Sequence, residues 1–220
     1  GGDEAGMVCR IDDCVDGART MAPLAPELAG SSSRPTAPGR RDLRDGGARA
    51  GLLDAVGEAR GPGGPPVLRR VAPDLEPADI DAIARIAIER QLGALIVSNT
   101  TISRPRLASP HAGEAGGLSG APLRDLAQQR LRDFRTATGG SIPLVGVGGI
   151  ASAEDAWARI RAGASLVQLY SAMVYGRPGL PRRPLRGLAG VALIHTRPCP
   201  RSAPGRRPSL PSPLTKTRHL

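Results

Sequence analysis

The chain has 220 residues, enough for one domain with a hydrophobic core but fewer than the roughly 250 of a complete (β/α)₈ barrel. Its 40% apolar content fits a globular protein, no uninterrupted apolar run is long enough to span a membrane, and three Cys are too few for a disulfide framework. The formal net charge of +10 lies entirely in residues 177–220, which hold nine Arg, one Lys and no acidic residue, so the rest of the chain is neutral.

Residues 1–66 are predicted to be a degraded or partly ordered early segment. Residues 12–29 allow a helix, whereas residues 30–50 are rich in Gly, Ser, Pro and Arg and show no periodicity. A helical pattern resumes at residues 51–60, and the turn-forming sequence GPGGPP at residues 61–66 separates this segment from the next.

The segment 67–176 alternates strands with helices. Short apolar runs predict strands at residues 67–72, 94–98, 143–148 and 165–170. Helices are predicted after Pro73 as far as Gly93, at residues 122–138, and from Ser152, which forms a capping box with Asp155, to Gly163. Continuous apolar strands of this kind indicate an α/β fold with a parallel sheet, either a barrel, which the short strands favour, or an open doubly wound sheet. The tail of residues 177–220, rich in Pro and Arg, is predicted to be disordered.

Polar or glycine-rich groups follow three of the predicted strands. Residues 98–101 place an amide and three hydroxyls after one strand, GVGGI (146–150) follows another, and Tyr170 and Ser171 follow the last. Glycines before a helix let backbone N–H groups approach phosphate oxygens, and barrels often hold a phosphate between two consecutive loops of this type. Each group on its own also suits an ordinary turn, but together they favour a ligand that carries a phosphate. The loop 99–121 between them is flexible enough in composition to act as a lid.

Five motifs in order carry a resemblance to a known family. They are APDL (72–75), SNTT (98–101), GGLSG (116–120), GVGGI (146–150) and GASLVQLYSA (163–172). Their order and spacing resemble dihydroorotate dehydrogenase, most closely the quinone-dependent class, and weaker similarity extends over residues 12–190. The resemblance implies the C-terminal half of a (β/α)₈ TIM barrel that binds FMN and oxidises dihydroorotate to orotate in de novo pyrimidine biosynthesis. It also implies a quinone acceptor and a location in the cytoplasm or, peripherally, on the cytoplasmic face of the inner membrane. Neither a nucleic acid partner nor a metal site is expected.

The resemblance also implies roles for individual residues. Asn99 and Thr100 fall where the family contacts the pyrimidine substrate. Positions that contact FMN in the family are occupied by Ser98, Gly120, Gly149, Tyr170 and Ser171. Ser33 is the nearest counterpart of the serine general base, although its loop, SSSRPTAPG, departs from the family pattern. Arg70 stands where the family has a lysine facing the flavin, and its planar guanidinium makes this a non-conservative change.

Three interpretations remain at this point. We expect the chain to be a fragment or defective gene product of the family, with residues 30–50 and 177–220 as candidates for out-of-frame sequence. A first alternative is a phosphate-binding barrel enzyme without flavin, such as a sugar-phosphate isomerase, which would leave SNTT and GGLSG unexplained. A second is a non-catalytic protein whose basic tail binds anionic partners, although the tail has no aromatic residue to stack on bases.

Overall fold

The computed structural model describes residues 15–20, 32–33, 46–61, 63–105, 107 and 109–175, with the backbone alone at 32–33 and 46–50. The strands are β1 (Ser32–Ser33), β2 (Leu68–Val71), β3 (Ala94–Val97), β4 (Leu144–Val147) and β5 (Leu166–Gln168). The helices are α2 (Gly46–Arg60), α3 (Pro77–Glu89), the 3₁₀ turn η2 (Ala121–Leu123), α4 (Arg124–Thr138), α5 (Ala153–Arg161) and α6 (Ser171–Tyr175). Residues 15–20 are also helical, whereas the prediction for the tail of residues 177–220 lies outside the described residues.

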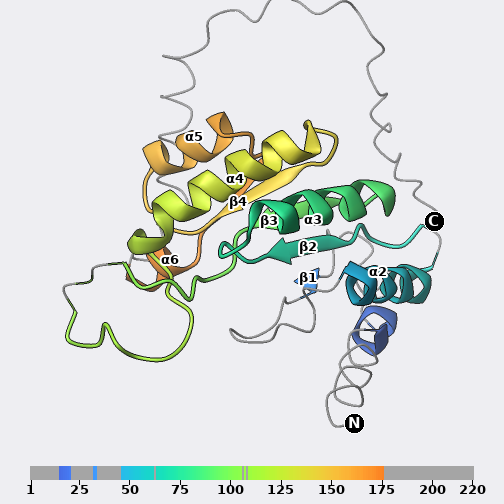
Figure 1. The fold of residues 1–220 in the computed structure, drawn as a ribbon, viewed down its shortest axis with the longest axis horizontal. Helices are drawn as coiled ribbons and strands as arrows, with labels where there is room; N and C mark the ends of the chain where they lie inside the picture. Colours follow the sequence, from blue (N-terminus) through green and yellow to red (C-terminus); the bar gives the residue numbers. More distant parts are fainter. Residues whose placement is uncertain are drawn as a thin grey trace, which may run out of the picture.

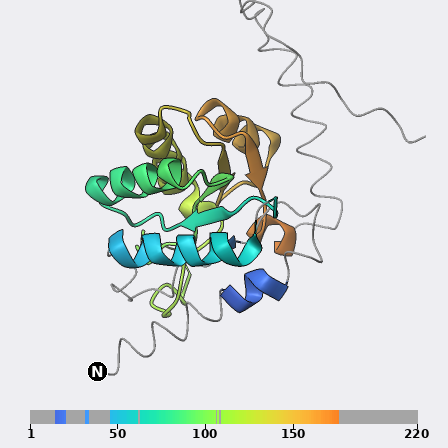
Figure 2. The same cartoon turned by 90° about the vertical axis from the view of Figure 1, so that its right-hand side faces the viewer.

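The five strands form one parallel sheet in the order β1-β2-β3-β4-β5, which is also their order in the chain. Helices α3, α4 and α5 lie side by side over one face of this sheet (Figures 1 and 2). A doubly wound sheet would reverse its strand order at one point and carry helices on both faces. Sequential parallel strands with helices on one side are instead those of a partial (β/α)₈ barrel, so the predicted fold class is confirmed.

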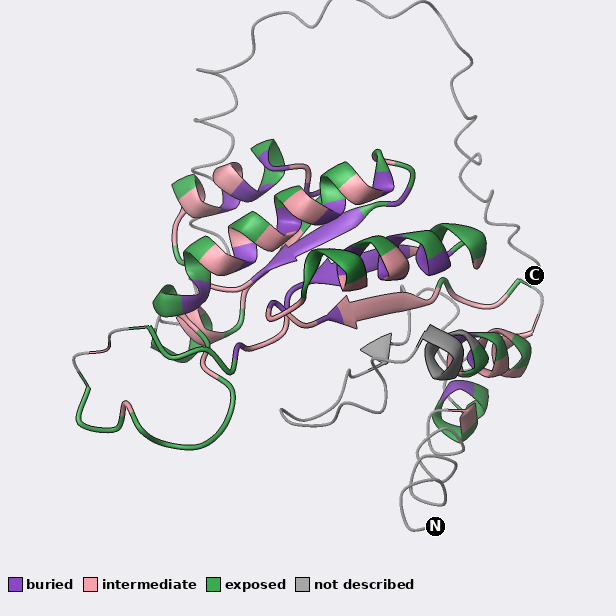
Figure 3. Cartoon of the chain, viewed as in Figure 1, coloured by how far each residue is buried: buried purple, intermediate pink, exposed green. Residues whose placement is uncertain are grey.

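Two apolar layers cover the two faces of the sheet. Leu95, Val97 and Leu144 pack on the helix side with Phe134 of α4 and the isoleucines of α3. Alternate residues of the same strands face the other way and form a second cluster, which consists of Ala94, Ile96, Val145 and Val147, with Leu68 packed against them. All eight residues of β3 and β4 are therefore buried (Figure 3), which explains why both strands appear in the sequence as uninterrupted apolar runs.

Helix α3 ends earlier than predicted. The sequence suggested Gly93 as its end, but the helix finishes at Glu89 with Arg90 as its C-cap, and Gln91 adopts the left-handed conformation with φ of 49°. Gly93 has a packing role instead, because a Cβ at this position would lie 2.5 Å from the Cβ of Pro66. The end of α3 is instead a local Schellman motif, in which the N–H of left-handed Gln91 and that of the next residue each donate back to a carbonyl of the last helical turn at 3.0 Å.

The other predicted helix signals are found as expected. α4 follows the turn that contains Pro122 and ends at Gly139, whose φ of 55° is left-handed. At the start of α5, the Ser152 side chain accepts a hydrogen bond from the Asp155 N–H, and the Asp155 carboxylate accepts one from the Ser152 N–H. This capping box fixes the entry into α5, directly after the GVGGI loop.

One strand was not predicted. β1 occupies Ser32–Ser33, inside the stretch treated as a loop in the sequence, and pairs with β2 so that Ser33 lies opposite Arg69. Two serines carry no apolar strand pattern, so this strand is defined by its pairing with β2 alone.

Candidate functional site

A cavity of about 700 Å³ opens at the carboxyl ends of strands β2 to β5. Its lining includes every residue assigned by resemblance to the cofactor or the substrate other than Ser33: Arg70, Ser98, Asn99, Thr100, Gly120, Gly149, Tyr170 and Ser171. These residues span a hundred positions of the chain, and they meet because parallel strands end at the same edge of the sheet. Ser33 closes β1 at that same edge, but its side chain lies outside the described part of the structure.

The end of β3 contributes the first polar wall. Ser98 is 2% exposed, and its hydroxyl donates to the carbonyl oxygen of Asn99 at 3.1 Å. The Asn99 N–H donates to the carbonyl of Val71 at 2.8 Å, which ties this loop to the end of β2. The backbone at Asn99 is thereby fixed beside the cavity, where its carboxamide can both donate and accept a hydrogen bond.

Asp74, within the APDL motif, holds the loop that follows β3. Its carboxylate accepts hydrogen bonds from the Thr101 hydroxyl, from the Ile102 N–H at 3.0 Å and from the Ser103 hydroxyl at 2.9 Å. This role of Asp74 was not predicted from the sequence, where APDL served only as a family motif. The acidic residue after a strand was the available signal, but its partners lie 27 to 29 residues away.

The base of the long loop 99–121 is fixed rather than free. Thr101 and Leu118 exchange two backbone hydrogen bonds of 3.0 and 2.8 Å, and the Arg104 guanidinium donates to the carbonyls of Glu114 and Gly116. Gly117 packs so closely that an added Cβ would lie 2.6 Å from the Cβ of Thr100. A lid motion of the whole loop, which its composition allows, would have to break these contacts at the base.

The GVGGI loop after β4 presents its backbone to the cavity. Gly148 and Gly149 both have left-handed φ angles, 103° and 69°, and a Cβ on Gly149 would come within 2.6 Å of the Arg124 Cα. Neither the Gly149 nor the Ile150 N–H donates a hydrogen bond to another described residue. Two adjacent backbone donors are thus left for a ligand, as an anion site requires.

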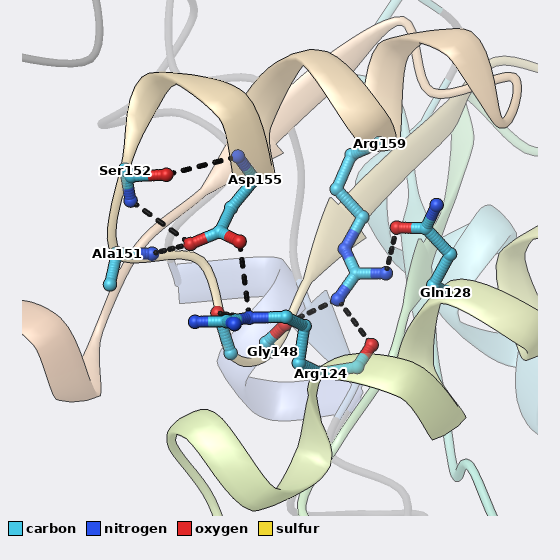
Figure 4. A network of polar contacts seen from close by, with 8 residues as sticks. Arg124, Gln128, Gly148, Ala151, Ser152, Asp155 and Arg159 are labelled. Atoms are coloured by element: carbon cyan, nitrogen blue, oxygen red, sulfur yellow. Dashed lines mark hydrogen bonds and ion pairs between the residues drawn. The ribbon is translucent and has the colours of Figure 1, made fainter.

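The start of α5 is less available to a ligand than the sequence suggested. Asp155 accepts hydrogen bonds from the N–H groups of Ala151 and Ser152 at 3.0 and 3.1 Å, so its own carboxylate occupies the helix terminus (Figure 4). The pKa of the exposed Glu154 carboxyl is lowered there, first by a hydrogen bond to a backbone N–H and then by the Ser152 hydroxyl. An anion in the cavity would therefore meet the glycine loop rather than the first turn of α5.

Residues that follow β5 form another wall of the cavity. The Ser171 hydroxyl hydrogen-bonds the Ser119 hydroxyl at 2.9 Å, which joins the GGLSG segment to the start of α6. Ser119 lines the cavity and was not predicted as a site residue, although it lies within the GGLSG motif. Gly120 lies beside Ser171, with a distance of 3.8 Å between an added Cβ and the Ser171 Cβ, and the Tyr170 side chain is 77% exposed at the rim.

Arg70 is the only charged residue among those described around the cavity. It alternates with Val71, which faces the helices, so its side chain lies on the inner face of the sheet together with that of Leu68. Its Nε is buried and has no hydrogen-bond partner among the described residues. An unpaired buried donor is costly, and an acceptor in the cavity would relieve that cost. Among the described residues, no group of three or more His, Cys, Asp or Glu could hold a metal ion.

The fold and this cavity together define a segment of a (β/α) barrel with a glycine-rich loop at the carboxyl edge of its sheet, where two backbone N–H groups have no partner among the described residues. The family model for dihydroorotate dehydrogenase matches residues 3–191. The chain therefore belongs to the dihydroorotate dehydrogenase family.

Individual relatives agree with this assignment. A quinone-type dihydroorotate dehydrogenase of Novosphingobium aromaticivorans is 68% identical over 179 residues, which cover 81% of this chain and 51% of the relative. The corresponding protein of Erythrobacter litoralis is 67% identical over 180 residues, covering 82% of this chain and 52% of the relative. Among solved structures, dihydroorotate dehydrogenase of Eimeria tenella in complex with ferulenol superposes with a TM-score of 0.76 at 29% identity, covering 84% of this chain and 55% of that one.

The chain spans about half the length of the curated relatives that it matches. No helix among the described residues is both long and apolar enough to cross a bilayer.

Proposed function

We propose that this chain binds FMN in the cavity at the carboxyl ends of β2 to β5 and that this site serves the oxidation of dihydroorotate to orotate. The observation that carries the proposal is the convergence of eight residues, assigned to cofactor or substrate by family resemblance, on one cavity of about 700 Å³. Membership of the family favours this function over a phosphate-binding barrel enzyme without flavin, such as a sugar-phosphate isomerase.

The residues present suit the two chemical ends of FMN. The unpaired N–H groups of Gly149 and Ile150 and the hydroxyls of Ser119 and Ser171 supply neutral donors for a phosphate. Arg70 supplies a buried, unpartnered donor with a positive charge for the ring system, in the position of the lysine that faces the flavin in the family. When bound, FMN would supply a hydride acceptor, a capacity that no side chain has.

The protein's own part in the reaction is binding, orientation and proton transfer. Asn99 and Thr100, held at the end of β3, would bind the amide edge of the pyrimidine ring through a carboxamide and a hydroxyl. Ser33 would take a proton from a ring carbon as general base, a role for which a serine needs a neighbour that compensates for its high pKa. A quinone is the proposed electron acceptor. Because quinones partition into lipid, we place the reaction on the cytoplasmic face of the inner membrane, with peripheral attachment.

The test is to express the chain and measure bound flavin directly. We expect a yellow protein whose released cofactor is FMN, with its absorbance bleached by dihydroorotate in the absence of oxygen and restored by a soluble quinone. An Asn99→Ala variant should keep the flavin and lose bleaching by dihydroorotate, whereas Gly113→Ala, in the same loop with open space around it, should behave like the unmodified chain.

The outcomes separate the two halves of the proposal. A colourless protein that takes up no added FMN would refute the cofactor assignment. A yellow protein that dihydroorotate does not bleach would leave a flavin-binding member of the family that lacks the proposed oxidation.

A further inference from the structure

A buried arginine lies behind the GVGGI loop. The Arg159 side chain descends from α5 and is 1% exposed (Figure 4). Its guanidinium donates to the carbonyl of Gly148 at 2.7 Å, to the carbonyl of Arg124 at 2.7 Å and to the side-chain oxygen of Gln128 at 2.9 Å. One side chain therefore joins the loop after β4 to two residues of α4.

A second arginine holds the next carbonyl of the same loop. The Arg124 Nε donates to the carbonyl of Gly149 at 3.1 Å and forms an ion pair of 3.1 Å with Asp155. Asp155 in turn accepts from the N–H groups of Ala151 and Ser152. The network thus fixes the loop on both sides of Ile150.

Because of the geometry of the peptide group, these contacts determine the directions of the Gly149 and Ile150 N–H groups. In a planar trans peptide the C=O of one residue and the N–H of the next point in opposite directions, and both peptides of Gly148–Gly149–Ile150 are trans. With the Gly148 carbonyl directed to Arg159, the Gly149 N–H points away from Arg159. With the Gly149 carbonyl directed to Arg124, the Ile150 N–H points away from Arg124. Neither of these two N–H groups donates a hydrogen bond to another described residue.

We propose that Arg159, together with Arg124, is a positioning residue for the anion end of the cavity: the two arginines hold the Gly148 and Gly149 carbonyls and so direct the next two N–H groups to a phosphate. The inference rests on the proposed binding of FMN and adds residues that do not themselves touch the ligand. The arginines supply orientation from behind the loop, and the ligand meets neutral backbone donors.

Two further observations fit a dedicated role for Arg159. Gly146, in the middle of buried β4, leaves room for the arginine stem, since a Cβ there would lie 3.2 Å from the Arg159 Cβ. Burial lowers the pKa of the Arg159 guanidinium to about 10, opposed by the charge of Asp155, so the group keeps its positive charge at neutral pH. Each of these features lowers the stability of the fold when taken by itself. A glycine weakens a buried strand, and a buried charge without a fully matching partner costs free energy of desolvation.

The experiment compares FMN with riboflavin, which lacks the phosphate, by flavin fluorescence titration of the full chain. Arg159→Met should lower the affinity for FMN by about tenfold or more and change the affinity for riboflavin by less than about twofold, because only the phosphate uses the oriented N–H groups. Arg159→Lys should recover part of the FMN affinity, and Arg124→Met should show the same FMN-selective loss. Arg161→Met, which removes an equal charge from the exposed side of the same helix, should leave both affinities unchanged.

A second measurement follows the Gly149 and Ile150 amide resonances during titration with inorganic phosphate. We expect them to shift in the unmodified chain and not in Arg159→Met. Equal losses for FMN and riboflavin, or a loss in Arg161→Met equal to that in Arg159→Met, would overturn the inference while leaving FMN binding intact. A phosphate response at these amides in a chain that binds no FMN would support the inference and refute the proposed cofactor. The inference also fails if neither FMN nor phosphate perturbs these amides.

Discussion

Replacing Gly117 by Ala tests whether the GGLSG segment positions the proposed substrate residue Thr100. An added Cβ would lie 2.6 Å from the Thr100 Cβ and still closer to its hydroxyl oxygen. Rotation about χ1 of Thr100 moves the hydroxyl but leaves the Cβ in place, so a change of rotamer cannot remove the clash. The two backbone segments must separate instead.

The size of the effect follows from that separation. The two Cβ atoms must move apart by about 0.8 Å to reach the 3.4 Å at which ordinary contact begins, and the Thr101–Leu118 hydrogen bonds adjoin the point of strain. Overpacking of this kind costs about 1–3 kcal/mol, and we expect the lower end because the loop is exposed. Displacing a positioned binding group by a large fraction of an ångström should also lower the affinity for orotate by about tenfold or more.

The assay is thermal unfolding together with orotate titration, and Gly113→Ala is the matched control. Gly113 lies in the same loop with no atom within 4 Å of its Cβ position, so both variants share the entropic effect of Gly→Ala on the unfolded chain. We expect Gly117→Ala to melt about 2–4 °C below Gly113→Ala for each kcal/mol lost. Equal melting temperatures and equal orotate affinities in the two variants would refute the reasoning.

Three further substitutions test the scaffold. Phe134→Ala empties a fully buried position in the helix-side core, and urea unfolding should show a loss of about 3–5 kcal/mol, whereas a loss below about 1 kcal/mol would contradict the packing described. Ser152→Ala removes half of the capping box and should cost about 1 kcal/mol in thermal unfolding. A hydrogen bond from Arg90 lowers the pKa of Asp54, so this pair stabilises the fold above the ordinary carboxyl pKa of 3.8 and the contribution is lost as pH falls below it. Asp54→Asn should therefore flatten the dependence of stability on pH in that acid range, measured by circular dichroism at low salt, and an unchanged profile would contradict the pairing.

Local chemistry was enough to predict most of the fold. The apolar runs at β3 and β4 were visible because both faces of these strands are buried, and Ser152 with Asp155 marked the start of α5 because a capping box is a contact between near neighbours. The strand at Ser32–Ser33 could not be found in the same way, since nothing local distinguishes it from a loop and only its pairing with β2 makes it a strand.

The residues of the candidate site also fall into two groups, those that local sequence predicts and those that depend on contacts distant in the chain. The glycines and hydroxyls directly after β3, β4 and β5 were predicted because they follow strands, and strand ends can be located in the sequence. The residues that hold those groups in place were missed. Arg159 reaches Arg124 across 35 positions, and Asp74 reaches Thr101 across 27. In the sequence such residues cannot be told apart from surface charges, because their partners lie far along the chain and include backbone carbonyls for Arg159 and a backbone N–H for Asp74, groups that almost any residue supplies.

The residues that hold the loops in place could explain how a phosphate is bound by a chain whose first 176 residues have no net charge. The excess positive charge lies in residues 177–220, whereas the part of the cavity lining that the structure describes contains one charged side chain, Arg70. At the GVGGI loop the two arginines act on the carbonyl side of the peptides, with Asp155 offsetting one of them. Affinity for an anion at this loop would then depend on the direction of two N–H dipoles more than on net charge. Because orientation is lost when a supporting contact is removed, a buried arginine behind the loop can affect ligand binding as strongly as a residue that touches the ligand.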